Sequence, residues 1–237
     1  MEAYVFYSHF EYSDIWPLMF GQSEKHLKGK KKYLITNQDH GEVNHEWTVI
    51  KYDEKKSYQE RVWKSLEQIK EEIVIFHHED MFLFSEPKWE VMNKLLGLVK
   101  QDKVDVIKLI KASYDNSAHE EFEKNIYYNP KNLLFCIQPT IIKREKLIKI
   151  FKYTKGNSMW QFEVNSNSLV DFMNYSSFYY HEGIENKRGM YHWDSQVYPY
   201  VATAVVKGKW DYEIYPKILS DLHKKYNIDP NKRGKNV

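Results

Sequence analysis

Short apolar runs alternate with amphipathic stretches along the first hundred residues. The apolar runs that predict strands lie at residues 3–8, 33–36, 47–52 and 73–76. Between them, residues 14–27 and the stretch that follows Ser57 carry apolar side chains at helical spacing. Regular alternation of strand and helix predicts an α/β fold, with a central mixed, mostly parallel sheet flanked by helices.

Two sites in the chain carry the sequence pattern of a helix start. Ser57-Tyr-Gln-Glu60 and Ser158-Met-Trp-Gln161 each place a hydroxyl three residues before a Glu or Gln. In this capping box the hydroxyl accepts a hydrogen bond from a free backbone N–H of the first turn. We therefore expect one helix to begin after Ser57 and another after Ser158.

The second half of the chain is less regular. Strands are predicted for residues 104–110, 127–128, 133–137, 178–180 and 201–206. Further helices are predicted to have Pro87 in a first turn, to begin at a cap on Thr140, and to span residues 212–226. Residues 113–124 form a polar stretch that predicts a long loop.

Composition limits the classes of protein that the chain can belong to. The 237 residues suit one large domain, and 42% hydrophobic residues suffice for a core. A net charge of +2 is not typical of a nucleic-acid-binding protein. Cys136 is the single cysteine, so no intrachain disulfide can form, and no apolar span is long enough to cross a membrane. Together these features predict a cytoplasmic protein that has no nucleic-acid partner and no transmembrane segment.

Aromatic residues are abundant, with 19 Tyr and 7 Trp. Each joins a flat apolar face to a polar tip, which suits ring-shaped polar ligands such as sugars. A tyrosine-rich core would require the same composition. The pattern therefore leaves both interpretations open.

The clearest chemical pattern is a buried strand that ends in two acids. Residues 73–76 are apolar, Glu79 and Asp80 follow two histidines, and residues 81–83 are apolar again. In an open α/β sheet, ligands bind beyond the carboxyl ends of the strands. Carboxylates at that position could hold Mg²⁺ or Mn²⁺ on a diphosphate. The other interpretation is a turn whose acids face solvent.

The two histidines of this segment could likewise be either metal ligands or structural residues. His78 and Asp80 face the same side if the strand stays extended, and an imidazole can also ligate a Mn²⁺-type ion. A histidine in such a place is more often a hydrogen-bonded structural residue.

Several common catalytic motifs do not occur in the sequence. Neither G-x-G-x-x-G nor the Walker pattern is present, which argues against dinucleotide oxidoreductases and P-loop ATPases. The G-x-S-x-G elbow and the H-E-x-x-H zinc motif do not occur either.

Four segments, in order along the chain, resemble GT-A-type glycosyltransferases. The strand ending in Glu79-Asp80 resembles their acidic motif, usually Asp-x-Asp, and is closer to the Glu-Asp variant of uncharacterised small transferases of large DNA viruses, phages and bacteria. Residues 134–139 resemble the strand and Gln-Pro turn beside the acceptor site, and Trp160-Gln-Phe-Glu163 resembles a Trp-x-x-Glu helix start. Residues 198–210 resemble the closing strand segment. The resemblance covers about residues 3–226.

The resemblance implies roles for particular residues. Glu163 would be the catalytic base, as in inverting members, and Asp80 with Glu79 would hold Mn²⁺ or Mg²⁺ on the donor. His181 and His192 are candidates for a third metal ligand. Gln138 and Trp160 would contact the acceptor. The residues expected to bind the donor follow the early strands: Ser8, His9, Tyr12, Asn37, Asp39 and His78.

These roles define an expected reaction and an expected organisation. The enzyme would transfer a hexose from a UDP- or GDP-linked sugar to a hydroxyl of a glycan or glycoconjugate, with metal assistance and inversion. Residues 1–124 would bind the nucleotide sugar and residues 125–226 the acceptor, with residues 227–237 as a polar tail of one domain. The alternatives are a sugar nucleotidyltransferase and a carbohydrate-binding protein without catalysis.

Overall fold

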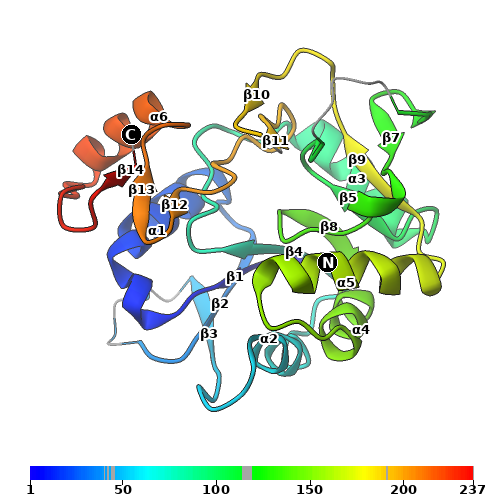
Figure 1. Ribbon diagram of the computed structural model, residues 1–237, viewed down its shortest axis with the longest axis horizontal. Coiled ribbons are helices and arrows are strands. Elements are labelled where there is room, and N and C mark those ends of the chain that lie inside the picture. Colours follow the sequence, from blue (N-terminus) through cyan, green and yellow to red (C-terminus); the bar gives the residue numbers. More distant parts are fainter. Residues whose placement is uncertain (40, 42, 44–45, 114–118, 191, 237) are drawn as a thin grey trace.

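The fold is built on a nine-stranded sheet with helices around it (Figure 1). A computed structural model describes residues 1–39, 41, 43, 46–113, 119–190 and 192–236. The strand order is β3-β2-β1-β4-β8-β5-β9-β7-β6. The strands are β1 (Glu2–Tyr7), β2 (Lys31–Thr36), β3 (Trp47–Lys51), β4 (Ile73–His78), β5 (Val106–Lys108), β6 (Glu121–Glu123), β7 (Ile126–Tyr128), β8 (Thr140–Lys143) and β9 (Ser177–Tyr180).

The N-terminal half of the sheet is parallel throughout. β1 pairs with β2 and β4, and β2 pairs with β3, all in parallel. In register, Tyr7 lies opposite both Ile35 and His78, so the carboxyl ends of these strands meet at one edge of the sheet. This edge is the place where the sequence puts its polar and acidic residues.

The C-terminal half of the sheet mixes directions. β8 is antiparallel to β4 and β5, β5 is parallel to β9, and β7 is antiparallel to β9 and β6. The predicted α/β class with a mixed sheet is therefore confirmed, and parallel pairing dominates its N-terminal half.

Helices cover the sheet and fix its edges. α2, α4 and α5 gather on the lower side of the sheet in Figure 1, and α3 lies on the upper side. The helices are α1 (Trp16–His26), α2 (Tyr58–Leu66), α3 (Trp89–Lys100), α4 (Arg144–Tyr153), α5 (Met159–Phe172) and α6 (Pro216–Lys225), with 3-10 helices η1 (Phe10–Ile15) and η2 (Lys131–Leu133). Both predicted caps are confirmed, because Ser57 Oγ accepts from the N–H of Glu60 and Ser158 Oγ from that of Gln161.

Several local predictions were wrong. Of residues 201–206 only β12 (Val205–Val206) is a strand, and the loop predicted for residues 113–124 contains β6. Residues 133–137 form no strand: Leu133 ends η2, and residues 134–137 continue as a loop. The backbone of this segment bonds to side chains of β5, β9 and α5. Thr140 does not cap a helix, because it begins β8. Pro87 lies before α3, which begins at Trp89, and the last helix begins only at Pro216. At residues 133–137 and at Thr140, tertiary partners override the local pattern.

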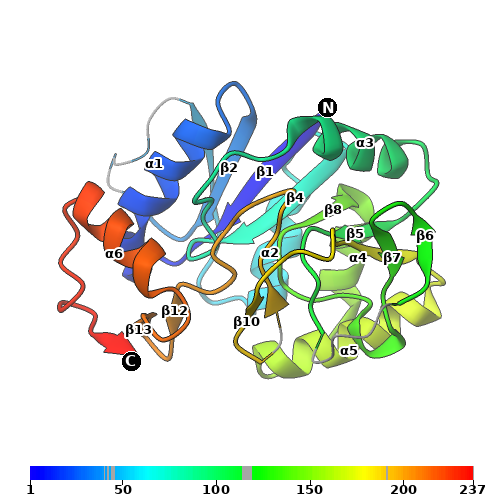
Figure 2. The same cartoon turned by 90° about the horizontal axis from the view of Figure 1, so that it is seen from above.

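The C-terminal segment packs against the N-terminal one. α6 lies beside α1 in Figures 1 and 2, and the Tyr226 hydroxyl donates to Oε1 of Gln22 over 2.9 Å. A second apolar cluster fills the contact and includes Leu18, Phe82, Trp210 and Leu219. Three short strands cover it: β12 (Val205–Val206), β13 (Lys209–Asp211) and β14 (Lys235–Asn236).

The segment predicted as a polar tail is thus partly paired, since β14 runs parallel to β13. β10 (Lys187–Arg188) and β11 (His192–Trp193) form a separate two-stranded ribbon. In the part of the chain that the structure describes, no helix combines the length and the apolar character needed to cross a membrane.

Candidate functional site

A cavity of about 680 Å³ opens between α5 and the loop before β8. Three predicted residues line it together: Glu163, Gln138 and Trp160. The volume lies within the range of small-molecule sites. Sequence positions 138 and 163 are far apart along the chain, so their meeting is a property of the fold.

Glu163 is held in this cavity by the backbone opposite it. Its Oε1 accepts a hydrogen bond of 2.7 Å from the N–H of Ile137. Burial raises the pKa of Glu163, while the Ile137 N–H and the charge of Lys108 act in the opposite direction. A carboxylate with a raised pKa beside a cavity is a suitable general base.

Gln138 and Trp160 occupy different depths of the cavity. The amide of Gln138 is fixed at both ends: its Nε2 donates to Ala202 O over 3.2 Å, and its Oε1 accepts from the Tyr200 hydroxyl over 2.7 Å. Trp160 is 74% exposed at the rim. An exposed indole at a cavity mouth presents a flat face on which a sugar ring can stack.

Cys136 also lines the cavity, and its thiol is buried. Burial raises the pKa of this thiol to about 11, so it is neutral at pH 7.

The two acids lie directly after β4, as predicted. Glu79 is buried, and Asp80 accepts a hydrogen bond of 3.2 Å at Oδ2 from the N–H of Val205. Burial raises the pKa of Asp80 to about 6, and backbone N–H groups act against that rise. Burial and the neighbouring Asp80 raise the pKa of Glu79 well above its usual value.

The acids and the cavity belong to one continuous region. Residues 200–205 contact Gln138 through Tyr200 and Ala202 and contact Asp80 through Val205. On the other side, the partly buried Tyr58 interacts electrostatically with both Glu79 and Glu163. Residues 200–205 therefore connect Asp80 with Gln138, which lines the same cavity as Glu163.

The residues present supply only part of a metal site. Within the described ranges, no three His, Cys, Asp or Glu side chains converge to hold a metal ion. Asp80 and Glu79 offer two carboxylates, which is the number with which Mg²⁺ is commonly held beside substrate phosphates. A cation here fits only if the donor's phosphates and water complete its ligands.

The proposed third ligands do not complete the set. His181 Nδ1 lies 3.0 Å from Oε2 of the buried Glu185, and its ring packs against Trp193. Those partners are separate from the described contacts of Asp80. The side chain of His192 lies outside the described part of the structure.

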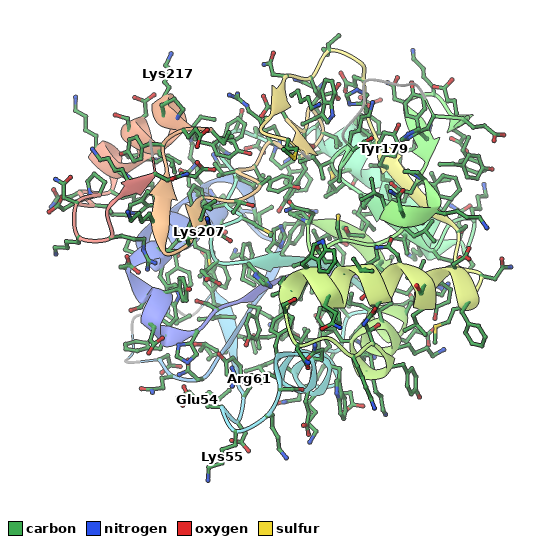
Figure 3. All side chains as sticks on the ribbon, viewed as in Figure 1. Glu54, Lys55, Arg61, Tyr179, Lys207 and Lys217 are labelled. Carbon is green, nitrogen blue, oxygen red and sulfur yellow. The ribbon has the colours of Figure 1, made fainter. Side chains whose placement is uncertain are left out.

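The ends of β1 and β2 form a second polar group. Asn37 Oδ1 accepts from the N–H of Phe10 over 2.8 Å, and its amide nitrogen donates to Glu54. His9 Nε2 lies 3.0 Å from the same Glu54 carboxylate. Arg61 donates to the Glu54 carbonyl, and Figure 3 shows both side chains at the lower edge of the molecule.

Sequence reasoning missed both Glu54 and Arg61. Glu54 lies in the loop after β3 and Arg61 lies in α2, and no motif in the sequence distinguishes either residue from other charged residues. The available signal was that Glu54 follows the third parallel strand at the same edge as His9 and Asn37.

The other predicted donor residues have mainly structural partners. Ser8 is fully buried, and its Oγ accepts from the indole N–H of Trp16 over 2.8 Å. His78 Nε2 lies 2.8 Å from the Tyr58 hydroxyl. Asp39 lies 3.4 Å from the ammonium of Lys51. Each of these three residues thus has a partner within the protein, and these contacts account for its position even if no donor binds.

Tyr12 has a partner that the sequence did not reveal. The guanidinium of Arg233 lies 4.9 Å from the centre of its ring and pairs with Asp14 through two hydrogen bonds. Arg233 also interacts electrostatically with Glu79 and Asp80. A cation from residues 227–237 therefore lies close to the acid pair.

Comparisons with known proteins give weak similarities. No protein-family model matches the sequence, and a search of curated proteins found no match. Among solved structures, S. aureus TarS 1-349 has a TM-score of 0.47 and 11% identity, over 76% of this chain and 60% of that one.

Two further structures give similar values. The bifunctional IspDF from Campylobacter jejuni has a TM-score of 0.47 and 11% identity, over 83% of this chain and 52% of that one. The 4-diphosphocytidyl-2C-methyl-D-erythritolsynthase from Anaerococcus prevotii has a TM-score of 0.45 and 9% identity, over 77% of this chain and 90% of that one. This chain thus spans less than two thirds of the first two. At these TM-scores and identities the similarity carries no weight for function.

Proposed function

We propose that the protein is a glycosyltransferase that moves a sugar from a nucleotide-diphosphate sugar to a hydroxyl of a glycan or glycoconjugate. The observation that carries this proposal is the shared cavity of Glu163, Gln138 and Trp160, joined to the acids after β4. A base, an amide and an exposed indole beside a diphosphate-binding edge are the groups that such a transfer needs.

The reaction follows from the position of Glu163. The acceptor hydroxyl lies in the cavity, and Glu163 takes its proton as the oxygen attacks the anomeric carbon of the donor sugar. The bond between that carbon and the phosphate oxygen breaks, and the nucleoside diphosphate leaves with the electron pair. With one carboxylate acting on the acceptor side, the configuration at the anomeric carbon inverts.

The opposite end of the site would hold the donor. Asp80 with Glu79 would bind Mg²⁺ or Mn²⁺ on the diphosphate, and the cation would stabilise the negative charge of the leaving group. The nucleotide would lie along the ends of β1 to β3, where His9, Asn37 and Glu54 gather. UDP- and GDP-linked sugars are the donors to test first.

Thermal unfolding with a panel of ligands tests donor binding. UDP, GDP, CMP and their sugar conjugates are added with and without Mn²⁺, since a ligand at a hundredfold excess over Kd stabilises the folded state by about 2.7 kcal/mol. We expect a Mn²⁺-dependent shift with one nucleotide and its loss in Asp80→Asn. Glu163→Gln should keep the shift.

Product analysis then tests the transfer itself. Glu163→Gln should lower the release of nucleoside diphosphate in the presence of acceptor by at least about a hundredfold, the effect of losing a general base. Full activity in Glu163→Gln would refute the assignment of the base. Release of pyrophosphate from a nucleoside triphosphate and a sugar phosphate would instead identify a sugar nucleotidyltransferase. Sugar binding without any nucleotide-dependent shift would identify a carbohydrate-binding protein.

A further inference from the structure

Lys108 is a fully buried lysine in the interior of the sheet. It is the last residue of β5, its side chain is 0% exposed, and its ammonium donates to the carbonyl of Leu133 over 2.6 Å. A buried ammonium is costly unless charges and hydrogen bonds compensate it. Its position therefore calls for a partner of opposite charge.

The loop of residues 133–137 connects Lys108 to Glu163. Lys108 binds the first carbonyl of the loop, and the last N–H donates to Glu163 Oε1 over 2.7 Å. Between these ends, Ser177 Oγ donates to Leu134 O, and Asn167 bonds both backbone groups of Phe135. Lys108 and Glu163 thus hold opposite ends of one short loop that forms a wall of the cavity.

Lys108 also acts on the charge of Glu163: burial lowers the pKa of Lys108, and the carboxylate of Glu163 acts in the opposite direction. Lys108, Cys136 and Tyr58 each interact electrostatically with Glu163. Burial raises the pKa values of the Cys136 thiol and the Tyr58 phenol, so both are neutral at pH 7. Of these three groups, Lys108 is the one that can carry a positive charge.

We propose that Lys108 is the positioning residue of Glu163: its buried ammonium holds the cavity wall and keeps the Glu163 carboxylate negatively charged. This inference rests on the proposed function, in which Glu163 is the base. A base must be ionised before it can take a proton, and burial alone favours the protonated carboxyl. A nearby opposite charge restores the ionised form without opening the cavity to water.

Carboxyl NMR of ¹³C-glutamate-labelled protein tests the electrostatic part without any substrate. Glu163→Gln identifies the resonance, which is then titrated in the wild type and in Lys108→Met. We expect the pKa of Glu163 to rise in Lys108→Met, since the loss of an opposite charge favours the protonated carboxyl.

The chain offers a matched control for the same substitution. Lys32 is also a buried lysine, in β2, but its ammonium binds Glu46 and backbone carbonyls. Lys32→Met should leave the titration of Glu163 unchanged. An unchanged Glu163 pKa in a folded Lys108→Met protein would overturn the proposal.

A reciprocal measurement covers the case in which Lys108→Met does not fold. Removing the charge of Glu163 must lower the pKa of Lys108 by the same coupling. The ¹³Cε resonance of Lys108 is titrated with pH in the wild type and in Glu163→Gln. This variant changes a residue at the cavity wall and leaves Lys108 in place. Identical titrations in these two proteins would also overturn the proposal.

The pH profile of transfer separates the inference from the proposed function. In Lys108→Met the acidic limb of kcat/KM should move to higher pH by the same shift as the Glu163 resonance, and a merely structural defect would lower the rate without moving the limb. If Glu163→Gln stays active while the NMR coupling is present, the proposed base is wrong and the coupling stands. If the base is confirmed and the coupling is missing, only the role of Lys108 fails.

Discussion

Several titratable side chains of this protein lie at least partly buried, and a few neighbours set the protonation of each. Glu163 has Lys108 and the N–H of Ile137, and Asp80 has the N–H of Val205. Because few groups compensate each charge, the loss of one partner changes the protonation of a residue rather than only its position. Residue-scale predictions are therefore best tested by titration.

His223 gives a prediction of this kind for stability. Burial, together with Lys235, lowers its pKa to about 4, and its Nδ1 lies 2.8 Å from the Tyr212 hydroxyl. A histidine with a depressed pKa contributes stability that is present above about pH 6.5, its unfolded value, and is lost as the pH falls toward 4. The contribution of His223 to the free energy of urea unfolding should therefore be smaller at pH 5 than at pH 7.

The comparison with His223→Gln isolates this effect. Glutamine does not titrate, so the loss between pH 7 and pH 5 should be smaller in the variant by about 1 kcal/mol. An equal loss in both proteins would mean that other groups carry the pH dependence.

The sequence predicted some site residues and missed others for a chemical reason. Glu163, Gln138 and Trp160 were predicted and now share one cavity. Lys108 and Arg233 were missed, because lysine and arginine are mostly surface residues and nothing local marks a buried one. Only the tertiary structure reveals such a residue.

At the scale of elements, α5 matters most, because it carries both Trp160 and Glu163. Ser158 caps its first turn, and the side chain of Gln161 accepts from the N–H of Asn157 over 3.0 Å. The chain enters the helix through Gly156, which lies against the backbone of Phe162. The start of α5 therefore fixes the orientation of the cavity residues.

Replacing Gly156 tests this close approach. A Cβ added there would lie 2.6 Å from the nitrogen and 2.8 Å from the Cα of Phe162, so the backbone would have to move. Gly156→Ala should lower the free energy of unfolding by about 1–3 kcal/mol, as overpacking does. It should also reduce transfer, because Glu163 follows Phe162 directly.

Gly97 provides the matched control for this substitution. It lies inside α3, and the nearest atom to an added Cβ is the Gln101 side-chain nitrogen at 3.8 Å. Gly97→Ala should stabilise the protein by up to about 1 kcal/mol through helix propensity. Destabilisation by both variants, measured by urea unfolding, would contradict this assignment of the close contact.

At the scale of the whole molecule, the C-terminal segment contacts residues 12–14 close to the acid pair. Arg233 pairs with Asp14 and lies over the rings of Tyr12 and Trp210. β14 then continues the small sheet, in which Val205 contacts Asp80. The last residues of the chain thus support one wall of the proposed donor site.

A pair of substitutions one residue apart tests this support. Arg233→Gln removes an ion pair and two ring contacts, so we expect a loss of about 1 kcal/mol in the free energy of unfolding. Lys232 is exposed, and Lys232→Gln should change stability by less than about 0.5 kcal/mol. Equal effects of the two variants would show that net charge, rather than the contacts of Arg233, is responsible.

The sequence by itself determined the local features of this protein. The apolar runs of β1 to β4, the caps at Ser57 and Ser158 and the acids after β4 all follow from interactions within a few residues. Only the tertiary structure decided the rest: the loop at residues 133–137, β8 at Thr140, and the meeting of Glu163 with Lys108 and of Arg233 with Asp14. The physical reason is that spacing and propensity act within one element, whereas burial and charge pairing depend on partners that only packing brings together.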